Sequence, residues 1–248
     1  MIHSRSKVCR CSIVSQLLAD NVGAAYETSS YLAVLFESNH QASSIFFHLV
    51  PELYLNVQES RDRCQITILI SLLHNLVSAY PSQSLFRDRL HALPHHIFPQ
   101  GTAAYLWLSS LSSSLRCRNY VKFEEVTRPT AFAQLLGKSL HKSDDVPTHS
   151  KYDPYLCDDA FHALVDKLRT VSRTMTWSVI RHAYRELSFR VELEGTRDWL
   201  TRSLALQSVL PGAKSHVPVE EWLEDKAAEG HVRQKEGVEH TYIISKVR

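Results

Sequence analysis

The chain has 248 residues, of which 44% are hydrophobic and 22% are charged, and its formal net charge is +2. This composition is ordinary for a globular protein. A net charge so close to zero excludes a positive electrostatic potential over the whole surface that would attract nucleic acid, so any basic surface must be local. Glycine numbers only 7, and neither GxxxxGK[ST] nor GxGxxG occurs, which excludes the common phosphate-binding loops and favours a helix-rich fold.

Cysteine usage and hydropathy indicate an intracellular, reducing location. The 5 cysteines are scattered and odd in number, which is not a disulfide framework. No apolar run reaches the roughly 18 residues that span a bilayer, so no membrane contact is expected. The basic start of the chain lacks the longer apolar region of a signal peptide.

The first part of the chain shows helical periodicity after a polar start. Residues 1–12 are polar and basic, and we expect a disordered tail there. From residue 13 onward the apolar residues recur at helical spacing. Helices are predicted at 13–22, 41–57, 61–80 and 83–93. A further helix is predicted to begin after a possible cap at 28–30. The most apolar of them, 61–80, is too long for a strand and should be a buried helix ending before Pro81.

Residues 102–130 form the central stretch of the chain. Leu108, Leu111 and Leu115 are three or four residues apart, which predicts a helix. Asn119, a residue that tolerates turns, then precedes a second apolar pattern that Pro129 closes. The stretch is therefore expected to be a helix, a tight turn and a second helix.

A long helix is predicted after the centre. Residues 131–140 should be helical, and the polar residues 141–154 should form a loop. The next helix starts near Asp158, and its apolar pattern continues through Leu187 and Val191, so Gly195 is predicted to end it.

The last part of the chain changes character. Short helices are predicted at 196–208 and 219–229, followed by a β-hairpin with strands at 230–233 and 240–244. Helix, helix and hairpin is the order of a winged helix, a helix-turn-helix variant. We therefore expect an all-α helical repeat (α-solenoid) at 13–195 and a winged-helix module at 196–248, although no internal repeat is readable.

No group of residues has the spacing of a catalytic or metal site. His3, Cys9 and Cys11 lack zinc-ligand spacing, and the histidines at 91–96 lack further ligands. Cys157 and His162 are neighbours on one predicted helix, which rarely gives a nucleophile and base their geometry. We predict a non-enzymatic protein without metal, cofactor or small-molecule substrate; a divergent enzyme is the least favoured alternative.

The cations of the last third are the candidate nucleic-acid contacts. Guanidinium groups suit bidentate contacts with phosphate, whereas a solvated face paired with Glu186 and Glu192 is the favoured alternative. The acidic helix at 219–229 is poorly suited to enter a major groove, which favours protein contact over DNA reading. Trp199 and Trp222 are expected in the core. The candidate cations are Arg181, Arg185, Arg190, Arg197, Arg202, Arg233 and Lys235.

Two motifs carry a resemblance to a known family. The turn Asn119-Tyr120-Val121-Lys122-Phe123 and the helix ending Ala183-Tyr184-Arg185 are similar to the SAC3/GANP family, over about residues 41–248. Glu124 stands where that family usually has an aromatic residue. The resemblance implies a PCI-like helical repeat with a winged helix, and a scaffold rather than an enzyme.

The resemblance also implies partners and a location. Such scaffolds act in nuclear mRNA export or transcription-coupled RNA processing, with another PCI-domain protein and a small acidic subunit; RNA or DNA is a further candidate partner. The winged helix would be the partner surface, through Trp222, Val232, Tyr242 and Ile244. The alternatives are another PCI assembly (proteasome lid, signalosome or translation initiation) in the cytoplasm, or a centrosome-associated relative without nucleic acid.

Overall fold

The computed structural model describes residues 22–50, 61–140, 155–188, 194–210, 212, 217–238 and 241–245. The chain is mostly helical, with a small three-stranded antiparallel sheet. The predictions for 1–12, for the cysteines near the start and for the loop at 141–154 lie outside the described residues. No helix of the described ranges is both long and apolar enough to cross a membrane.

The bounds of most predicted helices agree with the structure to within a few residues. A first helix covers 22–35 and runs through residues 28–30, so the prediction of a helix cap there is wrong. The other helices are α2 (Asn39–His48), α3 (Arg61–Ser78), α4 (Ser84–Ala92), α5 (Ala103–Arg116), α6 (Tyr120–Val126), α7 (Pro129–Leu140), α8 (Tyr155–Ala183), α9 (Glu194–Ser203) and α10 (Val219–Ala228). The strands are β1 (Glu186–Ser188), β2 (Val232–Gln234) and β3 (Thr241–Ile244).

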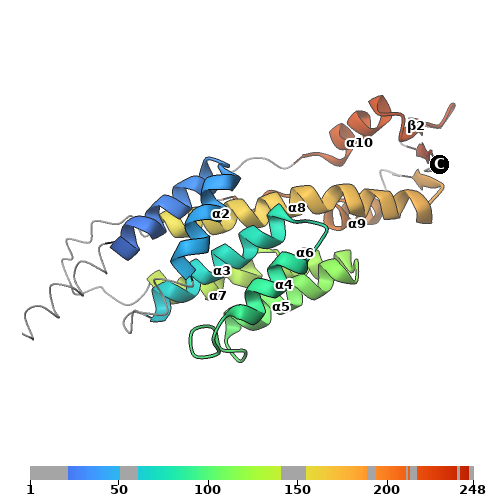
Figure 1. Ribbon diagram of the computed structural model, residues 1–248. Helices are drawn as coiled ribbons and strands as arrows, with labels where there is room; N and C mark the ends of the chain where they lie inside the picture. Colours follow the sequence, from blue (N-terminus) through green and yellow to red (C-terminus); the bar gives the residue numbers. More distant parts are fainter. Residues whose placement is uncertain are drawn as a thin grey trace, which may run out of the picture.

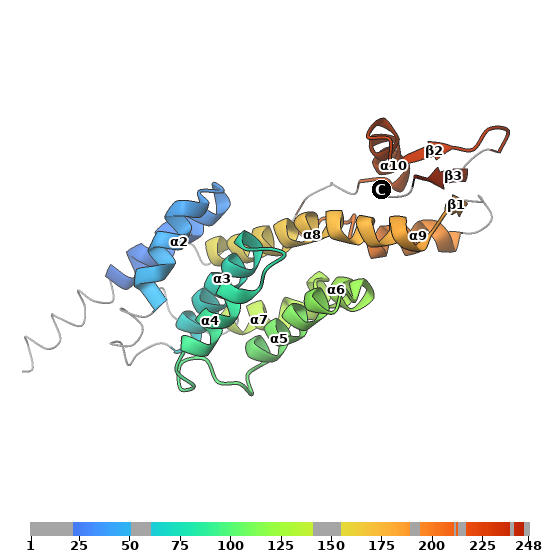
Figure 2. The ribbon, with the colours of Figure 1, turned by 45° about the vertical axis from the view of Figure 1, so that its right-hand side comes forward.

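Helix α8 is the longest element and joins the two parts of the molecule. It has 29 residues, and Figures 1 and 2 both show it running from the helices of the first part to the sheet and α10 at its other end. Asp158 lies in its first turn, where a negative charge complements the helix dipole, as the sequence predicts. The arrangement of the second part of the molecule therefore depends on where α8 ends.

The predicted helix–turn–helix at 102–130 is confirmed. Thr102 caps α5 by accepting a hydrogen bond from the Tyr105 amide at 3.3 Å, and Asn119 caps α6 by accepting one from the Lys122 amide at 3.0 Å. Arg118 between them adopts a left-handed conformation (φ 52°), which ends α5 tightly. Local hydrogen bonds thus explain why the pattern was readable from sequence.

Two hydrophobic cores divide the molecule, and the division falls within α8. The first core gathers the buried faces of α2–α7 and the N-terminal part of α8 through Leu168. The second core begins on the same helix at Trp177 and includes Leu200 of α9 and Trp222 of α10. The second unit therefore draws on residues before 196, the boundary that the sequence suggested.

The prediction that the long helix continues through Leu187 to Gly195 is wrong. Helix α8 ends at Ala183, Glu186–Ser188 form strand β1, and Gly195 lies inside α9. Strand β1 pairs antiparallel with β3, with Leu187 opposite Tyr242, and Leu187 is buried in the second core. Pairing with a strand more than fifty residues later satisfies this backbone, and helical periodicity cannot reveal such a partner.

The predicted hairpin is confirmed and is extended by β1. Strand β2 pairs antiparallel with β3, with Val232 opposite Ile244. The strand order is β1-β3-β2, so the last strand lies in the middle of the sheet. The end of α8, then β1, α9, α10 and the hairpin therefore form one continuous structural unit around the second core.

Two side chains of α8 clamp the segment that follows α9. Arg173 donates from Nε and Nη2 to the carbonyl oxygens of Leu204 and Ala205, both at 3.0 Å. Asp166 accepts hydrogen bonds from the Ser208 hydroxyl at 2.9 Å and the Val209 amide at 3.0 Å. Arg173 is thus used structurally and contributes to the joint between the two cores.

Replacing Arg173 by methionine should loosen this joint. The variant keeps an apolar stem but leaves two carbonyl groups without a charged donor, so we expect a loss of about 2 kcal/mol in the free energy of unfolding, with faster amide exchange in 200–209. Urea unfolding and hydrogen exchange would measure both. Lys167→Met, which removes a looser contact to Glu37 at 3.6 Å, is the matched control and should cost under about 1 kcal/mol. Equal effects would contradict the clamp.

Candidate nucleic-acid interface

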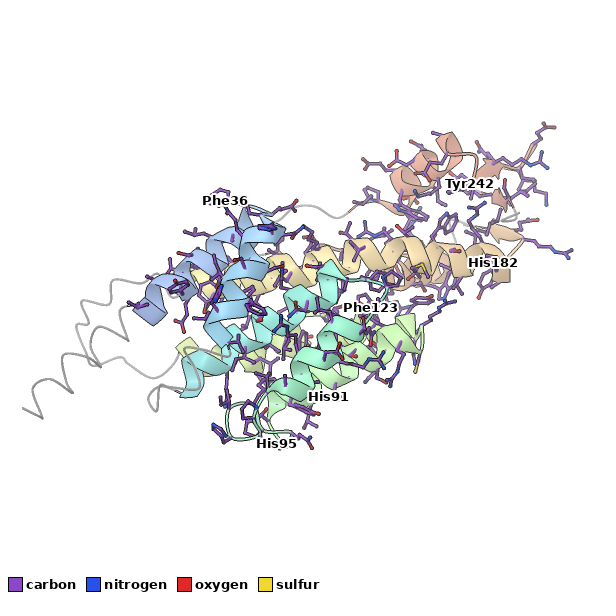
Figure 3. All side chains as sticks on the ribbon, in the orientation of Figure 1. Phe36, His91, His95, Phe123, His182 and Tyr242 are labelled. Carbon is purple, nitrogen blue, oxygen red and sulfur yellow. The ribbon has the colours of Figure 1, made fainter. Side chains whose placement is uncertain are left out.

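The predicted cations gather at the end of α8 and on the sheet and α9, the region where Figure 3 labels His182 and Tyr242. Arg181 is half-buried, and its Nε and Nη2 donate to the Ser245 carbonyl oxygen at 3.2 and 3.1 Å. This contact fixes the end of β3 against α8. Arg181 therefore has a structural role that the sequence did not reveal.

Two more of the predicted cations are neutralised by carboxylates. Arg197 pairs with Glu220 at 2.5 Å, and Lys235 pairs with Glu186 at 3.1 Å. Both pairs are exposed, so each contributes little stability, but each reduces the local positive charge. Glu186 was the partner that the solvated-face alternative named. Arg190 lies outside the described residues.

Arg185, Arg202 and Arg233 are exposed, and none of them has a carboxylate within ion-pair distance in the described part of the chain. Arg202 donates from Nε to the Asp198 carbonyl oxygen of its own helix at 3.3 Å, which leaves its terminal nitrogens available. Arg233 lies on β2 opposite Ile243 of the central strand. These three side chains are the free cations of the predicted set.

Sequence reasoning missed an aromatic pair beside these arginines. Tyr184 directly follows α8, and its ring centroid lies 5.2 Å from that of Trp199 on α9. Tyr184 is 45% exposed, whereas Trp199 is partly buried against the second core. The pairing depends on where α8 ends, so helical periodicity in this region gave no signal for it.

Helix α10 is acidic, as the sequence predicted. Burial raises the pKa of the Tyr242 phenol, and the nearby charges of Glu224 and Glu220 raise it further. A negative potential at α10 disfavours approach of a phosphate backbone to that helix. Arg185 after α8 and Arg202 on α9 lie outside this acidic helix, so they are better contacts for an anionic partner than α10 is.

The predicted partner-binding side chains are mostly core residues. Trp222, Val232 and Ile244 are buried in the second core, and the Trp222 ring meets that of Trp177 edge-on, with centroids 4.7 Å apart. Tyr242 is partly buried and packs against the same core. The prediction that Trp222, Val232 and Ile244 contact a partner directly is therefore corrected. Their apolar surfaces pack in the second core, and Trp222 is a core anchor as expected.

The residues that the sequence analysis weighed as a catalytic or metal site are Cys157 with His162 and the histidines at 91–96. Burial and the neighbouring Asp158 carboxylate raise the pKa of the Cys157 thiol to about 12, which keeps it protonated rather than nucleophilic. His91, His95 and His96 are exposed. No cluster of metal-ligating side chains occurs among the described residues.

A cavity of about 80 Å³ lies between α2, α3 and α4, and residues 92–94 after α4 also line it. Its walls are mainly apolar, and Arg89 is the ionisable side chain that lines it. The guanidinium of Arg89 stands over the Phe47 ring at 4.8 Å. Neither His162 nor His182 lines this cavity.

Comparison of the chain with protein-family models, with curated proteins and with solved structures found no match.

Proposed function

We propose that this chain is a non-enzymatic scaffold of the SAC3/GANP type, in which a PCI-like helical repeat carries a winged helix. The two motifs that resemble that family form the α5–α6 turn and the end of α8. Both are positions on which the architecture depends, since the first orders the central helices and the second connects the two cores. The proposed process is nuclear mRNA export or transcription-coupled RNA processing.

The observation that carries the proposal is the order of elements around the second core. The end of α8, β1, α9, α10 and the β2–β3 hairpin follow one another, and the strand order is β1-β3-β2. This order is the one expected of a winged helix, a helix-turn-helix variant with a hairpin after its helices, and it is what supports the proposal. It supports the predicted module even though its first helix and strand came from the part predicted as repeat.

The proposed partners are another PCI-domain protein and a small acidic subunit, with sequence-independent contacts to RNA or DNA. Burial of Trp222, Val232 and Ile244 means that a protein partner would meet the outer side of the module instead of these side chains. The exposed Arg185, Arg202 and Arg233 support the nucleic-acid contact, because guanidinium groups bind phosphate well.

The scaffold is tested by purifying the intact chain from its own cells and identifying the proteins that accompany it. A second PCI-domain protein, a small acidic subunit and RNA-processing factors would support the proposal. Proteasome, signalosome, initiation-factor or centrosome components would replace the process while keeping the architecture. Recovery of the chain alone at native levels would overturn the scaffold.

The nucleic-acid contact is tested by replacing Arg185, Arg202 and Arg233 together with glutamate. We expect the affinity for a single-stranded oligonucleotide to fall at least about tenfold, and the slope of log affinity against log salt to decrease by about 2, because three phosphate contacts are lost. Fluorescence anisotropy over a salt series measures both.

The matched control replaces Arg87, Arg116 and Arg118 with glutamate. These exposed residues lie on α4 and at the α5–α6 turn, and the change in net charge is the same. The control should retain most of the affinity. Equal losses in the two triple variants would show that net charge alone matters, and an absence of binding in the wild type would remove nucleic acid from the proposed function.

A further inference from the structure

The aromatic pair at the end of α8 is exposed but firmly held. The Tyr184 amide donates to the Ile180 carbonyl oxygen at 2.9 Å, so the backbone of Tyr184 continues the hydrogen bonding of the helix. Its ring rests on Trp199, which packs against the second core. A tyrosine in this setting loses little side-chain freedom on binding, because its position is already fixed by the fold.

The geometry of the pair leaves aromatic surface accessible. The planes of Tyr184 and Trp199 meet at 62°, an edge-to-face arrangement rather than a stack. In such a pair at least one ring keeps both of its faces clear of the other ring. Tyr184 is the more exposed of the two, so a flat partner can approach it from solvent.

Two exposed arginines are close to Tyr184 and Trp199 in the sequence. Arg185 follows Tyr184, and Arg202 lies three residues after Trp199 on α9, which places both on the same side of that helix. Both arginines are exposed and lack a carboxylate partner within the described ranges. Aromatic rings flanked by such cations are what proteins use to stack bases while holding the phosphate backbone.

We propose that Tyr184, supported by Trp199, is a stacking platform for a base of single-stranded nucleic acid, with Arg185 and Arg202 holding the adjoining phosphates. This inference rests on the proposed nucleic-acid contact and adds the class of strand. A duplex keeps its bases stacked inside and offers Tyr184 no free face, whereas a single strand does. The acidic α10 also disfavours insertion of that helix into a groove.

The test compares Tyr184→Leu with the wild type on three short probes: oligouridine, oligothymidine and a DNA duplex of the same length. We expect Tyr184→Leu to lose about tenfold in affinity for the single strands and to keep its duplex affinity, because base stacking is lost and the arginines remain. Tyr184→Phe keeps the ring and should keep the affinity. Tyr26→Leu, at a tyrosine that is 41% exposed on the first helix, is the matched control.

The outcomes separate this inference from the function on which it rests. Binding of all three probes with no loss in Tyr184→Leu would overturn the stacking platform and leave the arginine contacts standing. No binding of any probe by the wild type would overturn both. A difference between oligouridine and oligothymidine would identify RNA or DNA as the strand, and thermal unfolding of each variant excludes a loss of fold as the cause.

Discussion

Replacing Glu124 by alanine should lower the free energy of unfolding by about 3 kcal/mol, because it removes the counter-charge of a buried arginine. Glu124 is buried on α6 and accepts hydrogen bonds from Arg128 Nε at 2.9 and 3.0 Å and from Nη2 at 2.6 Å. Arg169 on α8 is only 2% exposed; burial lowers its pKa to about 10, and the charge of Glu124 opposes that shift.

Arg169 has few other compensating contacts. Its Nη1 donates to the Thr127 hydroxyl at 2.6 Å, while its Nε has no hydrogen-bond partner among the described residues. Loss of Glu124 would therefore remove the stronger of the two opposite charges that act on this desolvated guanidinium, leaving Asp166 and the Thr127 hydroxyl, and removing the compensation of a buried charge is costly. Chemical denaturation at neutral pH measures the effect.

The neighbouring carboxylate provides the control for this prediction. Glu125→Ala removes an exposed partner of Lys122 at 3.6 Å, and should cost under about 1 kcal/mol. Adding Arg169→Met to Glu124→Ala should recover much of the lost stability, since the buried charge is then gone. If the double variant is no more stable than Glu124→Ala, the charge pairing is not the reason for the loss.

Stability should also fall as the pH decreases from 6.5 towards 4, by up to about 3 kcal/mol from His74 alone. His74 is only 2% exposed, and its Nε2 lies 3.0 Å from the Ser43 hydroxyl oxygen. Burial, together with the positive charge of Lys167, lowers the pKa of His74 from 6.5 to about 4. The native state thus favours the neutral ring.

The sign of this pH dependence follows from where the proton binds. Above pH 6.5 the ring is neutral in both states and His74 has no effect on stability. Between 6.5 and about 4 only the unfolded chain takes up the proton, so unfolding becomes easier, and below that range the contribution levels off. His74→Gln should flatten the curve in this window relative to the wild type.

An exposed histidine supplies the comparison. His95 lies exposed in the loop after α4, and His95→Gln is the matched control for the loss of an imidazole. Urea unfolding at a series of pH values measures all three proteins. If His74→Gln and the wild type lose stability in parallel from pH 6.5 to 4, titration of His74 is not the cause.

Glu124 departs from the residue type that the resemblance leads one to expect, and its neighbours in the structure explain the departure. The SAC3/GANP resemblance leads one to expect an aromatic residue there, and the structure instead has a carboxylate whose charge acts on Arg169. A charge can occupy that buried position because Arg128 and Arg169 compensate it. Sequence reasoning could not find this pairing, since Arg169 is forty-five residues away along the chain.

The candidate interface was predicted only in part from sequence. Exposed arginines lie at the end of α8, on the sheet and on α9, but Arg181 and Arg197 have structural or ion-pair partners. Residue type indicates that an arginine can bind phosphate, whereas its availability depends on which carboxylates and carbonyls the fold brings near it. Tyr184 was missed for the same reason.

The sequence by itself determined the local elements: helical periodicity located α3, α4 and α10, and the cap at Asn119 located the turn before α6. These features are set by neighbours within about four residues. Only the tertiary structure decided that α8 ends at Ala183, that β1 joins β3, and which arginines remain free. Those outcomes depend on contacts between residues distant in the chain, which neither periodicity nor residue type encodes.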